Sequence, residues 1–169
     1  MPLTSSLSIA ANADLTSALD LATGSVPLRV RHAVSLATGT TAGKADKAFS
    51  DRRTLAASAT EDLDLAGVLL DGFGAAITFA RIKGLVIKAA DANSNNVVIG
   101  AASSNAWATL LGATHTVTLR PGAAFAVMAG AADATGYAVT AGTGDLLKVA
   151  NSGAGTSVSY DIVIIGASA

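Results

Sequence analysis

The stretch that decides the fold class is Val158-Ser159-Tyr160-Asp161-Ile162-Val163-Ile164-Ile165-Gly166. Apolar and polar side chains alternate in its first half, which is the period of two of a β-strand. From Ile162 onward both faces are apolar, which is typical of a central strand that is covered on both sides. Gly166 ends the run. The C-terminus is therefore predicted to supply an inner strand of a β-sheet.

The same period of two recurs earlier in the chain. Residues 28–36 place Leu, Val, His, Val and Leu on one face, with Arg29, Arg31 and Ser35 on the other. Residues 115–120 alternate in the same way. Pro121-Gly122 then predicts a turn that leads into a further strand at 124–128.

Two neighbouring segments depart from simple alternation. Between residues 77 and 90 the apolar face changes sides, which predicts a bend or bulge near Gly84. Residues 91–96, Asp-Ala-Asn-Ser-Asn-Asn, form a cluster of turn formers. We expect this cluster to close a hairpin between strands at 86–90 and 97–100.

Short strands separated by Gly, Asn, Pro and Ser about every ten residues predict an all-β fold. The two architectures that fit are an antiparallel β-sandwich and a jelly-roll-like barrel. The best helical candidate, residues 103–111, is short. We expect residues 1–43 to form an extended N-terminal arm with the first strands, held by the domain or by a neighbour, and residues 44–169 to form the β-domain.

Composition favours a part of an assembly over a free-standing catalyst. The chain is 51% hydrophobic, yet only 14% charged and 4% aromatic, whereas soluble domains are about a quarter charged. Small apolar side chains pack sheets closely and leave mildly apolar surface for neighbours. The net charge of −1 predicts no nucleic-acid partner. No apolar run reaches the roughly 18 residues of a membrane span, so no membrane partner is expected either.

Three motifs imitate cofactor or metal sites, and each departs from its pattern. Residues 39–45, Gly-Thr-Thr-Ala-Gly-Lys-Ala, lack one spacer residue and the hydroxyl of a phosphate loop. Residues 161–169 resemble the first strand of a dinucleotide fold, but no helix follows to bind a pyrophosphate. Asp91, Asn93 and Asn95 have the spacing of a calcium loop without its Gly and Glu. A polar turn is favoured over a calcium site, and no cofactor or metal is predicted.

No set of residues predicts catalysis. Cysteine is absent, and no serine lies in a nucleophile-elbow sequence. His32 lies on the apolar face of its strand, where a hydrogen-bonded core histidine is expected, whereas His115 is expected to be exposed. Asp62 and Asp64 share a strand face, and two solvated carboxylates explain them better than an acid–base pair does. The chain is predicted not to be an enzyme.

Five residues are candidates for contact with a partner. Arg29 and Arg31 form a basic pair on one strand face, and Arg52 and Arg53 lie in the densest charge cluster. Such residues are usually solvated, but arginine can also bind acidic groups of a partner. Trp107 is the only tryptophan. Core filling explains it somewhat better than an interface anchor does, although tryptophan is enriched at binding hot spots.

From about Lys44 to its end, the chain resembles a family of small virion proteins of tailed bacteriophages and prophages. The similarity rests on these segments: Ala48-Phe-Ser-Asp-Arg-Arg-Thr-Leu-Ala-Ala-Ser58, Glu61-Asp-Leu-Asp-Leu65, Phe79-Ala-Arg-Ile-Lys-Gly-Leu85, Leu119-Arg-Pro-Gly122, Gly144-Asp-Leu-Leu-Lys-Val-Ala-Asn-Ser152 and the strand from Tyr160 to Gly166.

The resemblance implies a non-enzymatic component of the particle. The role that it favours is capsid decoration, in which a cement protein binds the major capsid protein on the head exterior and stabilises the shell. It also implies a homo-oligomer, with a trimer favoured, that assembles in the bacterial host cytoplasm. The alternative is a head-fibre or tail-associated binding module that aids host attachment. The family has no defined site motif, so no functional residue is carried over.

Overall fold

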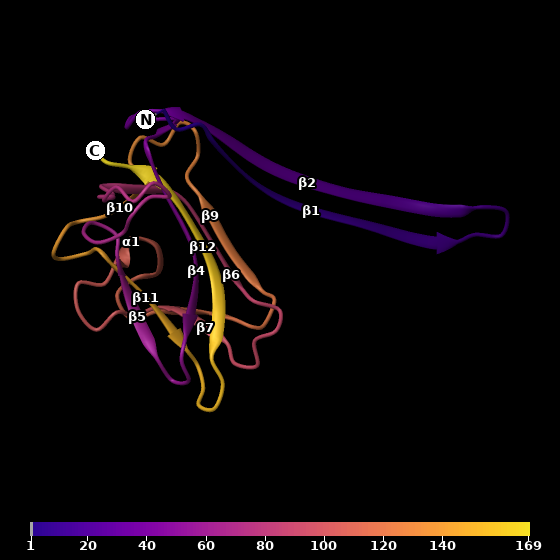
Figure 1. Ribbon diagram of the computed structural model, residues 1–169. Coiled ribbons are helices and arrows are strands. Elements are labelled where there is room, and N and C mark those ends of the chain that lie inside the picture. The colour runs from indigo at the N-terminus through magenta and orange to yellow at the C-terminus, as the bar shows by residue number, and fades with distance from the viewer. Residues whose placement is uncertain (1) are drawn as a thin grey trace.

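The computed structural model describes residues 2–169 and is all-β, with antiparallel sheets packed as a sandwich (Figure 1). The five-stranded sheet has the order β10 (Tyr137–Ala138), β6 (Arg81–Ala89), β12 (Val158–Ala167) and β4 (Lys47–Leu55), with β9 (Ala124–Met128) also paired to β6. The four-stranded sheet has the order β5 (Thr60–Asp64), β11 (Leu146–Asn151), β7 (Val97–Gly100) and β8 (Thr116–Leu119). These sheets share no strand, so the sandwich, rather than the closed barrel, describes the domain.

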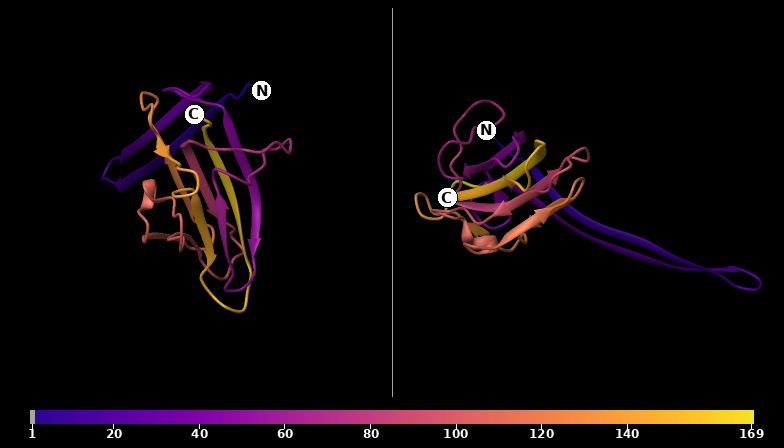
Figure 2. Two further views of the ribbon diagram at one scale, coloured as in Figure 1. Left: turned by 90° about the vertical axis from the view of Figure 1, so that its left-hand side faces the viewer. Right: turned by 90° about the horizontal axis from the view of Figure 1, so that it is seen from below.

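A third sheet contains β1 (Ser5–Ala18), β2 (Thr23–Thr38) and β3 (Lys44–Ala45). Figures 1 and 2 show β1 and β2 leaving one end of the sandwich as a long two-stranded ribbon. We call residues 5–38 the arm. Its base is the part next to the sandwich, and its tip is the turn at residues 19–22, which the Leu19 amide closes by donating to the Ala22 carbonyl.

Strand β12 is central, as its sequence predicts. It pairs in antiparallel fashion with β4 on one side and β6 on the other. Ile162 and Ile164 are fully buried in the main core, but Val163 on the opposite face is 39% exposed. Cover on that outer face begins at Ile165, which packs against the base of the arm. The expected burial of both faces is therefore correct only toward the end of the strand.

The main core lies between the two sheets. Apolar residues of alternate positions on β6 and β12 meet those of β5, β7 and β11. Burying such side chains contributes about 1.5–3 kcal/mol each to the free energy of unfolding. The residues of this core that are less than 2% exposed include the following: Leu65, Ile77, Phe79, Ile82, Leu85, Ile87, Val97, Ile99, Tyr160, Ile162 and Ile164.

The bulge expected near Gly84 is present in β6. Gly84 pairs with Ile165, but the next pair on β12 is Gly166 with Ile82, so Lys83 is the extra residue. This shift explains why the apolar face changes sides in the sequence. Lys83 is buried, and its ammonium group donates a hydrogen bond to the Asp133 carbonyl. Desolvation by burial lowers the pKa of Lys83.

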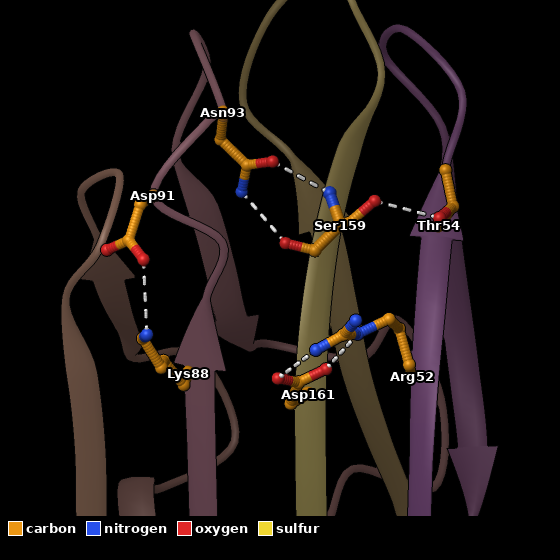
Figure 3. Close-up of polar contacts among 7 residues, drawn as sticks. All are labelled: Arg52, Thr54, Lys88, Asp91, Asn93, Ser159 and Asp161. Carbon is orange, nitrogen blue, oxygen red and sulfur yellow. Dashed lines mark hydrogen bonds and ion pairs between the residues drawn. The ribbon is translucent and has the colours of Figure 1, made fainter.

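The hairpin expected across residues 91–96 is wrong. Strands β6 and β7 belong to different sheets, so the segment crosses from one layer of the sandwich to the other. The turn formers brace this crossing. The Asn93 side chain both donates to the Ser159 carbonyl and accepts from the Ser159 amide, each at 2.8 Å (Figure 3). The Pro121-Gly122 turn and the following strand are confirmed, and this connection also crosses between sheets, from β8 to β9.

Residues 28–36 form a strand, as predicted, but most of the side chains expected to be buried are exposed. They lie within β2, but Leu28, Val30 and His32 are exposed, and only Val34 and Leu36 are buried. The expected core histidine is therefore a surface residue. Alternation identifies a strand with one apolar face, but beyond its base the arm has no second layer that could cover this face.

The helix expected at 103–111 is reduced to α1 (Ala108–Leu111). The Trp107 amide donates to the carbonyl of Leu146, the first residue of β11, which ties the residues before α1 to that strand. His115 is exposed, as predicted.

Adjacent positions of β12 should respond very differently to truncation. We expect Ile162→Ala to lower the free energy of unfolding by about 2–5 kcal/mol, because it leaves a cavity in the core. Val163→Ala is the matched control, since it also removes methyl groups from β12 but on the open face. Urea unfolding followed by circular dichroism measures both. Equal losses in the two variants would contradict the one-sided cover of this strand.

Candidate interaction surfaces

The arm is amphipathic over its whole length. Its two strands pair without interruption from Ser5 with Leu36 to Ala18 with Thr23. Residues directly opposite one another point to the same side of a ribbon. One side, which we call the arm face, therefore gathers the apolar residues: Ile9, Ala11, Ala13, Leu15, Val26, Leu28 and Val30, with His32 opposite Ile9.

The arm face is covered at its base and open beyond it. Leu7, Val34 and Leu36 form a second buried cluster with Ile165 on the outer side of the five-stranded sheet. Gly84 makes this contact possible, because a Cβ atom there would overlap the Leu7 side chain. Farther out, Leu15 is 74% exposed and Val26 is 66% exposed. The arm thus continues an established packing surface into solvent.

The opposite side of the arm is polar and carries Arg29 and Arg31. Arg29 lies 3.7 Å from the Asp14 carboxylate and donates to the Ala13 carbonyl. Ser25 donates to the same carboxylate at 2.6 Å. Within residues 2–169, Arg31 has no ion-pair partner. This side is suited to water or to a polar partner.

Arg52 is held by a cross-strand pair on the outer side of the sheet (Figure 3). Its guanidinium group donates to both oxygens of Asp161, at 2.6 and 2.9 Å. This hydrogen-bonded pair lowers the pKa of Asp161. Both side chains are exposed, and exposed pairs of this kind contribute little to stability. The Arg52 charge is therefore satisfied within the chain, yet remains accessible.

Arg53 belongs to a structural network rather than to a free surface. Its guanidinium group binds Glu61 at 2.6 Å and Asp51 at 2.8 Å. The Tyr160 hydroxyl donates to the other Glu61 oxygen at 2.6 Å. Burial, followed by this hydrogen bond to a carboxylate, raises the pKa of Tyr160. The network links β4, β5 and β12, so it braces the two sheets against one another.

Trp107 lies in the core and is only 5% exposed. Its indole Nε1 donates to the Ala138 carbonyl at 2.8 Å, and its ring meets Tyr137 edge to face at 6.5 Å. The core interpretation of this residue is confirmed. It is not available as an interface anchor in this conformation.

A second apolar surface was missed by sequence reasoning. The loop between β5 and β6 exposes Val68, Leu70 and Phe73, the last at 83%. Asp71 shapes the loop by accepting hydrogen bonds from the amides of Phe73 and Ala75, and these bonds lower its pKa. We call the three apolar residues the loop patch. The sequence feature that could have indicated this patch is Phe73, which stands between two glycines in a chain with few aromatic residues.

The candidate metal-binding and acid–base residues are not brought together into one site. Within residues 2–169, no group of three or more His, Cys, Asp or Glu side chains could hold a metal ion. Asn93 and Asn95 of the calcium-like spacing use their side-chain amides to brace neighbouring loops. Asp91 pairs with Lys88 at 3.3 Å, and Asp64 accepts a turn hydrogen bond from the Ala66 amide. These residues are explained by local structure.

No family model, curated protein or solved structure matches the chain. Over residues 2–169 there is no helix with the length and apolar character needed to cross a membrane.

Because the Tyr160 hydroxyl is buried, the free energy of unfolding should fall at alkaline pH. Because its folded pKa lies above the ordinary 10.0, its stabilising contribution is complete below pH 10 and declines as the pH rises toward the folded value. Tyr160→Phe should lower the free energy of unfolding by about 1.5–3 kcal/mol at pH 8, through loss of the bond to a carboxylate.

The gap in unfolding free energy between wild type and Tyr160→Phe should narrow at pH 11, because ionisation of Tyr160 then stabilises the unfolded wild-type chain relative to the folded one. Urea unfolding of both proteins at the two pH values measures the gap. All other side chains are common to the two proteins, so their contributions to the gap cancel. A gap that stays constant would show that the Tyr160 hydroxyl is not held neutral by the fold.

Proposed function

We propose that this chain is a non-enzymatic structural protein of a tailed-phage particle, and specifically a capsid decoration protein. In this role it binds the major capsid protein on the head exterior and stabilises the shell. The proposal joins the sequence resemblance over residues 44–169 to the surface of the folded chain.

One observation carries the proposal: a braced sandwich extends an arm whose apolar face is open. A two-stranded ribbon is marginally stable by itself in water, and an exposed apolar patch of this extent is typical of an interaction site. Leu15, Val26, Leu28 and Val30 are all more than half exposed. Such an element fits a protein whose structure is completed by its neighbours in an assembly.

The domain also suits a place in a shell. Its two sheets are locked together by the apolar core and by the network of Arg53, Glu61 and Tyr160. The loop patch offers a second apolar contact surface, on a segment distinct from the arm. A rigid body with two separate contact surfaces is able to bridge neighbouring subunits.

The proposal is tested on particles produced by the phage or prophage that encodes the chain. We expect the protein in stoichiometric amounts in purified particles, and particles without it to release DNA at a temperature several degrees lower. Quantitative mass spectrometry and a dye-release melt measure these effects. Gold labelling of a C-terminal tag distinguishes the head exterior from the tail, where the alternative of a host-attachment module would place it.

A matched pair of variants refines this test. Phe73→Ser removes the most exposed part of the loop patch, and Thr109→Ser is a control of small effect elsewhere on the domain. If the loop patch contacts the shell, only Phe73→Ser should weaken retention of the protein on particles. Particles that are equally stable with and without the protein would overturn the decoration role.

A further inference from the structure

The arm and the sandwich enclose an apolar corner. Near the base, a groove runs between the arm residues Leu7 and Ile9 and the outer side of the five-stranded sheet. The sheet wall of this groove includes the following residues, which we call the sheet patch: Val86, Ala126, Met128, Val163 and Ile165. Figure 1 shows the arm leaving the end of the sandwich on the side where β4, β12, β6 and β9 lie.

The arm face and the sheet patch are already complementary within one chain. Leu7 and Val34 pack on Ile165, with Val86 and Met128 partly buried against them. Arm residues farther out carry the same kinds of side chain, namely Leu28 and Val30, in the same register. On the sheet, Val163 beside this contact is still 39% exposed. The arm face and the sheet patch thus contact one another at the base of the arm, and each chain leaves a further part of both surfaces exposed.

The areas distinguish two ways of covering the arm. About ten residue pairs extend beyond the base, and a two-stranded ribbon of that length has a face of roughly 300 Å². Two arms packed face to face would bury only that much on each chain, whereas stable interfaces bury about 600–1,000 Å² on each partner. If each chain docks its arm on another copy and receives an arm in return, each chain buries its arm face and, in addition, the exposed part of its sheet patch, which includes Val163. Exchange therefore buries more area on each chain than simple arm pairing does.

We propose that the occupant of the apolar corner is a second copy of this chain, with the arm face of one copy lying on the sheet patch of the next. Each copy donates one arm and receives one arm, so the copies link through their arms into a closed pair, a ring or an extended chain. The polar side of the arm, with Arg29 paired to Asp14, stays in water. This inference does not depend on the capsid role, because it concerns the purified chain alone.

Two neighbouring alanines on opposite sides of the arm provide the test. Ala11 lies on the arm face opposite Val30, and Ala10 lies on the polar side opposite Arg31. Ala11→Asp buries an unpaired carboxylate in the proposed contact, which should weaken self-association by about 30-fold or more. Ala10→Asp adds the same charge on the polar side of the arm and should change the dissociation constant of self-association less than about threefold. Sedimentation equilibrium of the three proteins measures the dissociation constants.

A second measurement identifies the surface that receives the arm. The chain has no cysteine, so single cysteines can be introduced cleanly. Val30→Cys and Ala126→Cys proteins are mixed and treated with a short bis-maleimide linker. We expect crosslinked pairs that contain one of each variant, and far fewer when Ala10→Cys replaces Val30→Cys.

The outcomes separate the possible occupants. A wild-type chain that sediments as a monomer at concentrations of about 100 μM would overturn the inference. Binding of the arm to capsid protein alone would appear as monomers in solution together with retention on particles, and would leave the decoration role intact. Efficient linking of Val30→Cys to itself, without linking to Ala126→Cys, would mean that the arms pair with each other and would overturn the assignment to the sheet patch.

Discussion

The placement of β12 between β4 and β6 is the constraint on which the rest of the structure depends. Its inner side supplies Tyr160, Ile162 and Ile164 to the main core, and its outer side supplies Ile165 to the contact with the arm. One strand thus joins the two hydrophobic clusters. The Tyr160 hydroxyl further ties this strand to β5 in the opposite sheet, through Glu61. Both the stability of the sandwich and the placement of the arm consequently depend on the 10 residues of β12.

The strands were predictable because their signal is local. Alternation of side chains identifies β12, β8 and β9, and the changed face between residues 77 and 90 identifies the bulge at Lys83. Which strands pair is a long-range property, so the connection through Asn93 was assigned to a hairpin when it crosses between sheets. The same polar residues that form tight turns also brace long connections, as the two hydrogen bonds to Ser159 show. Composition alone cannot distinguish these two uses.

Candidate contact residues were harder to predict, for a related reason. Trp107 fills the core, which was the favoured interpretation, whereas His32 was expected in the core and is on the surface. Arg52 and Arg53 both looked like free charges, but their acidic partners lie across strands, at Asp161 and Glu61. An alternating strand shows which side is apolar and leaves open whether anything covers that side. For Leu28 and Val30 the answer depends on whether a second layer is present, which is a question of topology.

The arm leaves the domain and returns to it at the same place. Its strands meet the sandwich at neighbouring points, Ser5 beside Leu36, while the Leu19–Ala22 turn lies at the far end. Each extra pair of residues inserted at this tip would lengthen the arm by about 3.3 Å without moving either attachment point. The length of the arm can therefore change without any change in the sandwich. The same geometry makes the tip a convenient site for inserting a foreign peptide, which the arm would hold clear of the sandwich.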